Sequence, residues 1–258
     1  MKPISDLFAL TGRGALITGG SKGLGLALAK CFVAAGANVI VSSRHEEELR
    51  RAVDEIRTCG RGQVSHLVAD MTRREDVKRL ADAATLAMGH VDILVNNAGT
   101  NLPQAADEIT DEVWDNILQL NLTSCMALTR ALVPDMKRKR WGRIIHISSV
   151  MALASKAGRG AYSATKAALI GMARAHALEL GPFNITVNCL APGPFETELT
   201  HKVLSTEQKV LFADRTAIGR WGQPEELCGP ALLLASEAGS FITGATLVVD
   251  GGVLCKTF

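Results

Sequence analysis

A tyrosine and a lysine lie four residues apart in an alanine-rich stretch of the sequence, at Tyr162 and Lys166. Residues i and i+4 share one face of a helix, so the two side chains are expected to be neighbours. A free tyrosine, with a pKa of about 10, is a weak base near neutral pH. A cation about 4 Å away, at an effective dielectric constant of about 20, favours the phenolate by about 4 kcal/mol. The alternative is a buried tyrosine with a surface lysine one turn away.

Such a tyrosine predicts proton transfer at an alcohol or carbonyl oxygen, because a hydride leaves a secondary alcohol only when a base takes the hydroxyl proton. Ser149 follows a predicted strand at the edge where sites in open α/β sheets form, so its hydroxyl can bind the substrate oxygen. It is otherwise a turn residue. Asn121 lies in an apolar helical run, where an amide is disfavoured. It is otherwise a buried or helix-kinking asparagine.

A glycine-rich loop follows the first predicted strand, from Thr18 to Gly25. Glycine lets the backbone turn sharply and approach a pyrophosphate, which a helix N-terminus stabilises. The spacing is neither Gly-x-G-x-x-Gly nor a Walker loop, and a simple tight turn is the alternative. The residues expected around the pyrophosphate are Gly19, Ser21, Lys22, Gly23, Leu24 and Gly25.

The second predicted strand is followed by Ser42, Ser43 and Arg44, with no acidic residue there. NAD(H) sites place a carboxylate on the adenosine ribose, whereas a guanidinium pairs with a 2′-phosphate. Lys22 can reach the same place. The sequence therefore favours NADP(H) over NAD(H), with an exposed loop arginine as the alternative reading of Arg44.

Short β-like runs alternate with longer helical patterns along the whole chain, with no linker or repeat. This order predicts one α/β domain over residues 1–258, a doubly wound Rossmann fold whose seven-stranded parallel sheet is flanked by helices. An excursion at about 194–221 is expected to form a substrate lid. The expected strands are 15–17, 39–41, 64–69, 92–95, 143–147, 185–188 and 247–249, and the expected helices 23–35, from 46 onward, 73–88, 111–136, 161–180 and 224–235.

Further motifs fall in a characteristic order: Asn96-Asn97-Ala98-Gly99, then Asn121, Ser148-Ser149, Tyr162 to Lys166 and Pro192-Gly193. Together with the glycine loop, they make the chain resemble the short-chain dehydrogenase/reductase family from about Gly14 to Gly252. The resemblance implies an NADP(H)-dependent oxidoreductase acting on a carbonyl or secondary alcohol, with Asn121, Ser149, Tyr162 and Lys166 as the catalytic residues.

The resemblance also implies particular roles. Ser149 rather than Ser148 is the catalytic serine, and Asn121 holds a water that joins Lys166 to solvent. Asp70 would accept from the adenine amino group, or else shape the start of the next helix. Thr197 would contact the carboxamide, or else be a loop residue. The remaining expected cofactor contacts are Met71, Asn97, Ala98, Gly99, Tyr162, Lys166, Pro192 and Gly193.

Two substrate classes remain open. The stretch Asn97 to Asn101 resembles gluconate 5-dehydrogenase-like enzymes, which reduce keto sugar acids. Those enzymes often carry an arginine shortly afterwards, which this chain lacks, although Lys156 or Arg159 could substitute. The other resemblance is to 3-oxoacyl-carrier-protein reductases. A catalytically silent dinucleotide-binding sensor or scaffold is the alternative function, because a fold alone does not prove activity.

Bulk composition narrows the partners. The chain has 28 basic and 26 acidic residues, which offers no strong field for nucleic acid, and no apolar run is long enough to span a membrane. Its six scattered cysteines predict free thiols in a reducing compartment rather than disulfides or a metal site. We expect a cytoplasmic protein. Small residues all around the Tyr162 helix predict burial on more than one side, as in a homotetramer or homodimer.

Overall fold

The computed structural model describes residues 3–197 and 205–256, and within these ranges seven strands form one parallel sheet in the order β3-β2-β1-β4-β5-β6-β7. The order turns back between β1 and β4, as in a doubly wound Rossmann fold. The strands are β1 Gly14–Thr18, β2 Asn38–Ser43, β3 Val64–Val68, β4 Ile93–Asn96, β5 Gly142–Ile147, β6 Ile185–Pro192 and β7 Thr246–Val249. The predicted fold class is confirmed.

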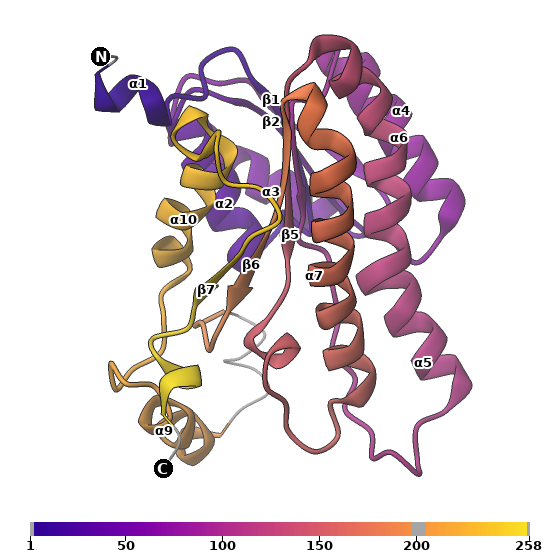
Figure 1. Cartoon of the computed structure of the whole chain (residues 1–258), viewed down its shortest axis with the longest axis vertical. Coiled ribbons are helices and arrows are strands. Elements are labelled where there is room, and N and C mark those ends of the chain that lie inside the picture. The colour runs from indigo at the N-terminus through magenta and orange to yellow at the C-terminus, as the bar shows by residue number, and fades with distance from the viewer. Residues whose placement is uncertain (1–2, 198–204, 257–258) are drawn as a thin grey trace.

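Helices cover both faces of the sheet (Figure 1). On one face α2, α3 and α10 pack through side chains such as Leu28, Phe32 and Leu49, and on the other α4, α6 and α7 pack through Leu80, Leu128 and others. In the described part of the chain, no helix has the length and low polarity needed to cross a bilayer. The helices are α1 Ile4–Phe8, α2 Gly23–Ala34, α3 Glu46–Arg57, α4 Arg74–Met88, α5 Asp111–Leu118, α6 Ser124–Lys139, α7 Gly160–Leu180, α9 Thr206–Asp214 and α10 Cys228–Ala235.

The parallel register brings the carboxyl ends of the central strands to one edge of the sheet, at the lower end of Figure 1. The loops that follow β1, β4, β5 and β6 therefore meet there. In open α/β sheets, ligands bind at this edge, next to the point where the strand order turns back.

Several boundaries differ from the sequence prediction. The helix expected over 111–136 is divided by a π-helical turn, η1 Gln119–Thr123, and its last part ends at Lys139. The helix expected over 224–235 opens with a 3₁₀ turn, η4 Pro224–Leu227. The 194–221 excursion contains α9, β6 extends to Pro192, and α1 was not predicted.

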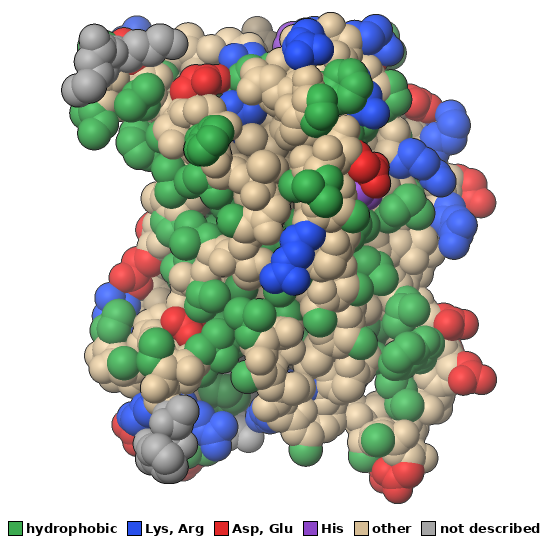
Figure 2. All heavy atoms as spheres, in the orientation of Figure 1, with side chains coloured by type: hydrophobic (Ala, Val, Ile, Leu, Met, Phe, Trp, Pro, Cys, Tyr) green, Lys and Arg blue, Asp and Glu red, His purple; other side chains and the backbone are tan. Residues whose placement is uncertain are grey.

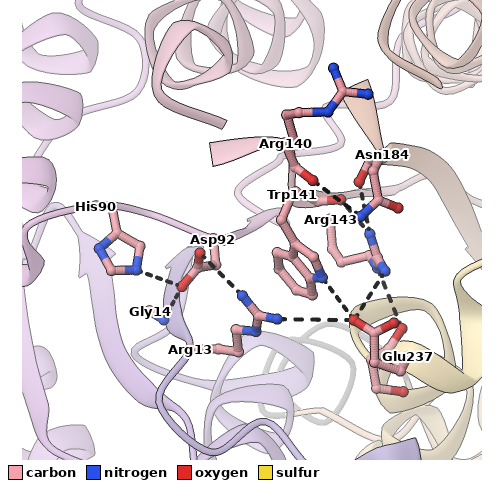
Figure 3. Close-up of polar contacts among 11 residues, drawn as sticks. Arg13, Gly14, His90, Asp92, Arg140, Trp141, Arg143, Asn184 and Glu237 are labelled. Carbon is pink, nitrogen blue, oxygen red and sulfur yellow. Dashed lines mark hydrogen bonds and ion pairs between the residues drawn. The ribbon is translucent and has the colours of Figure 1, made fainter. Parts of the chain in front are cut away.

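The opposite edge of the sheet is held by charged side chains around one tryptophan (Figure 3). The Trp141 ring lies between the guanidinium groups of Arg13 and Arg143, at 3.6 and 4.3 Å from its centroid. Its Nε1 donates to Glu237 over 2.7 Å, and Arg143 Nη2 lies 3.6 Å from the same carboxylate. Arg143 is fully buried, and burial lowers the pKa of its guanidinium. This network needs Glu237, because a buried cation without a partner is strongly destabilising.

Candidate active site

Helix α7 places Lys166 against Tyr162, as the four-residue spacing predicted. The Lys166 ammonium lies 5.6 Å from the centroid of the Tyr162 ring and is only 4% exposed. Its Nζ donates a 2.7 Å hydrogen bond to the carbonyl of Ile147, the last residue of β5. The contact fixes the cation at the carboxyl edge of the sheet, where it can attract negative charge on a nearby oxygen.

Asn121 lies within the π-helical turn and is fully buried. Its Oδ1 accepts from the amide of Thr100, and its Nδ2 donates to the Thr100 carbonyl, both over 2.9 Å. Nδ2 also lies 3.3 Å from Oγ1 of Thr165, beside Lys166 on α7. A Cβ placed on Gly99 would lie 3.2 Å from Asn121 Oδ1 and 3.5 Å from Lys166 Nζ. Asn121 therefore joins the loop after β4 to the tyrosine–lysine helix.

The two serines after β5 have different contacts. Ser148 Oγ donates to the carbonyl of Lys166 over 2.8 Å, which ties the strand to α7. Ser149 Oγ accepts from the amide of Met151 over 3.1 Å and begins the short 3₁₀ turn η2 Val150–Ala152. Because that contact uses only the oxygen as acceptor, the hydroxyl proton of Ser149 stays available for a bound oxygen.

The glycine loop is compressed against the end of β4. Gly19 and Gly23 have φ of 64° and 56°, which disfavours side chains. A Cβ on Gly25 would lie 2.3 Å from the Gly19 carbonyl oxygen. Asn97 Nδ2 donates to the carbonyls of Thr18 and Gly19 over 2.9 and 3.0 Å. The backbone of the loop therefore lies close to the start of α2, and Leu24 packs against the core.

Thr18 and Asn97 hold the two loops together. Thr18 Oγ1 accepts 3.0 Å hydrogen bonds from the amides of Asn97 and Ala98. The Nδ2 group of Asn97 is therefore engaged within the protein. The role of Thr18 was not predicted, because an ordinary strand-end threonine gives no signal in the sequence.

Arg44 projects from the end of β2 and is exposed. No hydrogen bond or ion pair engages its side chain within residues 3–197 and 205–256, so its guanidinium is available to bind an anion. The neighbouring Ser43 accepts from the amide of His45 over 3.4 Å.

Lys22, which we expect to reach the same place as Arg44, contacts a carboxylate of α3 in this structure. Lys22 Nζ lies 3.1 Å from Oε1 of Glu48, and Ser21 Oγ donates to Oε2 over 3.2 Å. Partial burial opposes ionisation of Glu48, but these contacts hold the pKa of its carboxyl below the ordinary value. The end of β2 carries no acidic residue, but Glu48 of α3 lies beside the glycine loop.

The residues after β3 contribute mainly backbone. Asp70 Oδ1 accepts from the amide and the hydroxyl of Thr72, over 2.9 and 2.7 Å, so this carboxylate shapes the turn before α4. That arrangement agrees with the alternative in which Asp70 shapes the start of the next helix. A carboxylate can accept further hydrogen bonds, so Asp70 can also accept from a ligand. Met71 is buried in the core, so only its backbone is available to a ligand.

The loop after β6 begins with Pro192 and Gly193, whose amide donates to Val249 over 2.9 Å. Thr197 lies against the glycine loop, since a Cβ on Gly23 would be 3.4 Å from its methyl group. This contact brings the loops after β1 and β6 together. The rest of the predicted lid includes residues 198–204, which lie outside the described residues.

The two ends of the excursion are joined at its base. Phe195 and Gly222 form an isolated β-bridge, and Glu196 N donates to the Gly222 carbonyl over 2.8 Å. On α9, the Phe212 ring packs edge-on against Trp221 at 5.5 Å between centroids. Lys156, from the loop before α7, lies 5.1 Å from the Phe212 ring centroid. The excursion therefore contacts the loop that leads to Tyr162.

His146 is buried in β5. Its Nδ1 lies 3.1 Å from Asn96 Nδ2, and its Nε2 has no hydrogen-bond partner among the described residues. Burial, with His176 and Lys166 nearby, lowers the pKa of its imidazole to about 3. The ring is therefore neutral at physiological pH.

Comparison with known proteins gives consistent results. A family model described as short chain dehydrogenase matches residues 13–208. The chain is 37% identical to a gluconate 5-dehydrogenase of Gluconobacter oxydans (strain 621H), over 96% of this chain and 97% of that protein. It is also 37% identical to a 3-oxoacyl-(acyl-carrier-protein) reductase of Vibrio cholerae, over 95% and 98% of the two chains.

A solved structure agrees in fold over the whole chain. The crystal structure of a gluconate 5-dehydrogenase from Burkholderia cenocepacia J2315 in complex with NADP and tartrate matches with a TM-score of 0.92 and 35% identity. The match covers 99% of this chain and 100% of that chain.

Proposed function

The chain belongs to the short-chain dehydrogenase family, and from that premise we propose that it is an NADP(H)-dependent oxidoreductase that interconverts a carbonyl and a secondary alcohol. The observation that carries this proposal is the buried Lys166 ammonium, held 5.6 Å from the Tyr162 ring at the carboxyl edge of the sheet. A dinucleotide-binding protein without catalysis has no need for a buried cation beside its only tyrosine.

In the proposed reaction Tyr162 exchanges a proton with the reacting oxygen. During carbonyl reduction its hydroxyl gives up the proton, and Lys166 stabilises the negative charge left on the phenol oxygen. Ser149 donates its hydroxyl proton to the substrate oxygen and so holds the carbonyl in place. The bound nicotinamide supplies or accepts the hydride.

Asn121 would act through its backbone. Its amide side chain already bonds both backbone groups of Thr100 and contacts Thr165. The carbonyl of Asn121 lies in the π-helical turn and accepts from the Cys125 thiol over 3.4 Å, which leaves its second lone pair for a water. That carbonyl is the group we assign to holding a water that connects Lys166 to solvent.

The residues fit a 2′-phosphorylated dinucleotide. Positive φ at Gly19 and Gly23, and the lack of room for a Cβ on Gly25, keep the start of α2 open to a pyrophosphate. The exposed guanidinium of Arg44 is suited to the 2′-phosphate. A relative solved with NADP supports this choice. Asp70, Gly99, Pro192 and the other predicted contacts are proposed on the same basis.

The test is NADPH oxidation against pooled carbonyl compounds, with Tyr162→Phe beside the wild type. The pools are keto sugar acids, 3-oxoacyl thioesters, aliphatic ketones and diketones, and NADH serves as the comparison cofactor. We expect turnover in at least one pool and its loss in the variant. NADPH binding without turnover in any pool would instead favour the silent sensor or scaffold.

We further propose that the substrate carries an anionic group, as keto sugar acids do and as 3-oxoacyl thioesters do through their carrier. Lys156 supports this, because it is exposed and lies where α9 contacts the loop before Tyr162. Lys156→Ala should raise the KM for an anionic substrate about tenfold, as expected for one lost charge contact of about 1.4 kcal/mol, and leave a neutral diketone unchanged. Equal effects on both would contradict the proposal.

We also propose that a second copy covers α7, in a homodimer or homotetramer. One face of α7 is buried on the sheet, while Ala164, Ala167, Gly171 and Leu178 form an exposed stripe on the other. Most exposed residues of α7 are small, the exceptions being Arg174, Leu178 and Glu179. Figure 2 shows apolar side chains scattered over the face along which α7 runs. Light scattering at micromolar concentration tests it, and the 27.4 kDa mass of one chain would contradict it.

A further inference from the structure

Two cysteines from distant parts of the chain meet on the face of the sheet opposite α7. Cys31 lies in the last turns of α2, and Cys228 is the first residue of α10. The two are 197 residues apart in sequence, yet α2 packs against η4 and α10 (Figure 1). Two such thiols can react with each other only if their sulfur atoms lie close together.

The hydrogen bonds place both thiols on the same turn of α2. Cys31 Sγ lies 3.8 Å from the carbonyl oxygen of Cys228, and Cys228 Sγ donates to the carbonyl of Ala27 over 3.4 Å. Ala27 is four residues before Cys31, so its carbonyl is the one that the Cys31 amide faces in the helix. Each thiol therefore lies beside the backbone of the helix that carries the other, which brings the two cysteines together.

The pair is also accessible and unequal in acidity. Both side chains are half-buried rather than enclosed. The neighbouring Cys228 thiol lowers the pKa of Cys31 against the opposing effect of burial. The neighbouring Cys31 thiol and partial burial raise the pKa of Cys228. A thiolate is the reactive form, so Cys31 is the residue that an oxidant meets first.

We propose that Cys31 and Cys228 form a reversible disulfide on exposure to a low-molecular-weight disulfide such as oxidised glutathione, making this pair a redox modification site. The link joins the helix that begins in the glycine loop to the helix that follows the 194–221 excursion. It requires no partner protein and is independent of the proposed carbonyl reaction.

The exchange has two steps. The Cys31 thiolate attacks one sulfur of the reagent, forms a mixed disulfide and releases one reagent thiolate. The mixed disulfide leaves no thiol or thiolate at Cys31, which removes the main cause of the raised pKa of Cys228. Cys228 loses its proton and attacks Cys31 Sγ, releasing the second reagent thiolate. In sum two cysteine thiols lose two electrons and two protons, and the reagent disulfide becomes two thiols.

The other cysteines provide internal controls. Cys125 and Cys189 are buried, and burial raises the pKa of both thiols, that of Cys189 to about 12. They should resist the reagent. Cys59 and Cys255 are more accessible but are not hydrogen-bonded to another cysteine among the described residues, so they should stop at the mixed disulfide.

The test uses the reduced full chain, incubated with oxidised glutathione and then trapped with N-ethylmaleimide. Cleavage after Lys, Arg and Glu gives a peptide beginning at Cys31 and a separate one, 227–237, whose only cysteine is Cys228. We expect mass spectrometry to find these two peptides joined in more than half of the chains. The product should migrate as one chain without reductant, and dithiothreitol should release it.

Cys228→Ser provides the matched variant. In it we expect Cys31 to accumulate as the glutathione mixed disulfide, because no resolving thiol remains. Wild-type chains in which Cys31 and Cys228 carry only maleimide or glutathione separately would overturn the proposal. A linked product that migrates as two chains would also overturn it.

Discussion

Replacing Lys166 by methionine tests the electrostatic basis of the proposed reaction. The substitution keeps the length of the side chain and removes its charge. Lys166 is 4% exposed, so solvent screens its field little, and it lies 5.6 Å from the Tyr162 ring centroid. At an effective dielectric constant of about 20, a unit charge at that distance stabilises an opposite charge by about 3 kcal/mol. Loss of this stabilisation predicts a decrease in kcat/KM of about a hundredfold.

The assay is NADPH-dependent reduction of the carbonyl compound that the pooled screen identifies, at neutral pH. NADPH binding, measured by fluorescence, separates weaker cofactor binding from slower chemistry, and a thermal melt checks folding. Lys78→Met is the matched control, because it removes an exposed charge from α4 by the same substitution and should stay within about twofold. A Lys166→Met enzyme that keeps more than a third of the wild-type kcat/KM, or an equal loss in the control, would refute the reasoning.

Three other perturbations have outcomes that follow from the structure. Arg44→Ala should raise the KM for NADPH at least about tenfold and leave that for NADH unchanged; equal effects in steady-state kinetics would contradict the 2′-phosphate role. Glu237→Gln should lower the free energy of unfolding by about 1–2 kcal/mol, because buried Arg143 loses its counter-charge; the effect is limited because Glu237 is itself 39% exposed. Asp82→Asn, which breaks an exposed ion pair, is the control in urea melts, and an equal decrease in both variants would contradict the prediction. His146 has a pKa of about 3 in the folded chain, below its ordinary value of 6.5. Between these two pH values the unfolded chain binds a proton that the folded chain does not, so stability is lost as the pH falls. Between pH 7 and 5 the wild type should lose about 2 kcal/mol more than His146→Gln; the same loss in both would exclude this histidine as the cause.

Local signals in the sequence were enough for the sheet and the glycine loop. Each strand is a short run that contains valine, isoleucine or threonine and lies between helical patterns, and a parallel sheet follows from that alternation. Gly19 and Gly23 adopt positive φ, which is what glycine in such a turn predicts. The four-residue spacing of Tyr162 and Lys166 fixed their shared face before any tertiary contact was known.

Features that depend on tertiary packing could not be predicted from local sequence signals. Glu48 reaches Lys22 because α3 docks its apolar side, including Leu49, on the sheet, and that orientation brings together residues 26 positions apart. The π-helical turn at Asn121 replaces one regular turn in a pattern that reads as a continuous helix. The small residues of α7 were expected to be buried on more than one side, but a single chain leaves Ala167 and Gly171 exposed.

Transfer of deuteride from NADPH labelled at the nicotinamide C4 position tests the central claim most directly. The alcohol product is analysed by mass spectrometry for the wild type and for Tyr162→Phe, with NADPH labelled on both faces of C4 and its binding checked in both. The account predicts one deuterium on the new alcohol carbon with the wild type and none above the enzyme-free background with the variant. Labelled alcohol formed equally by both proteins, or by neither while NADPH binds, would contradict it.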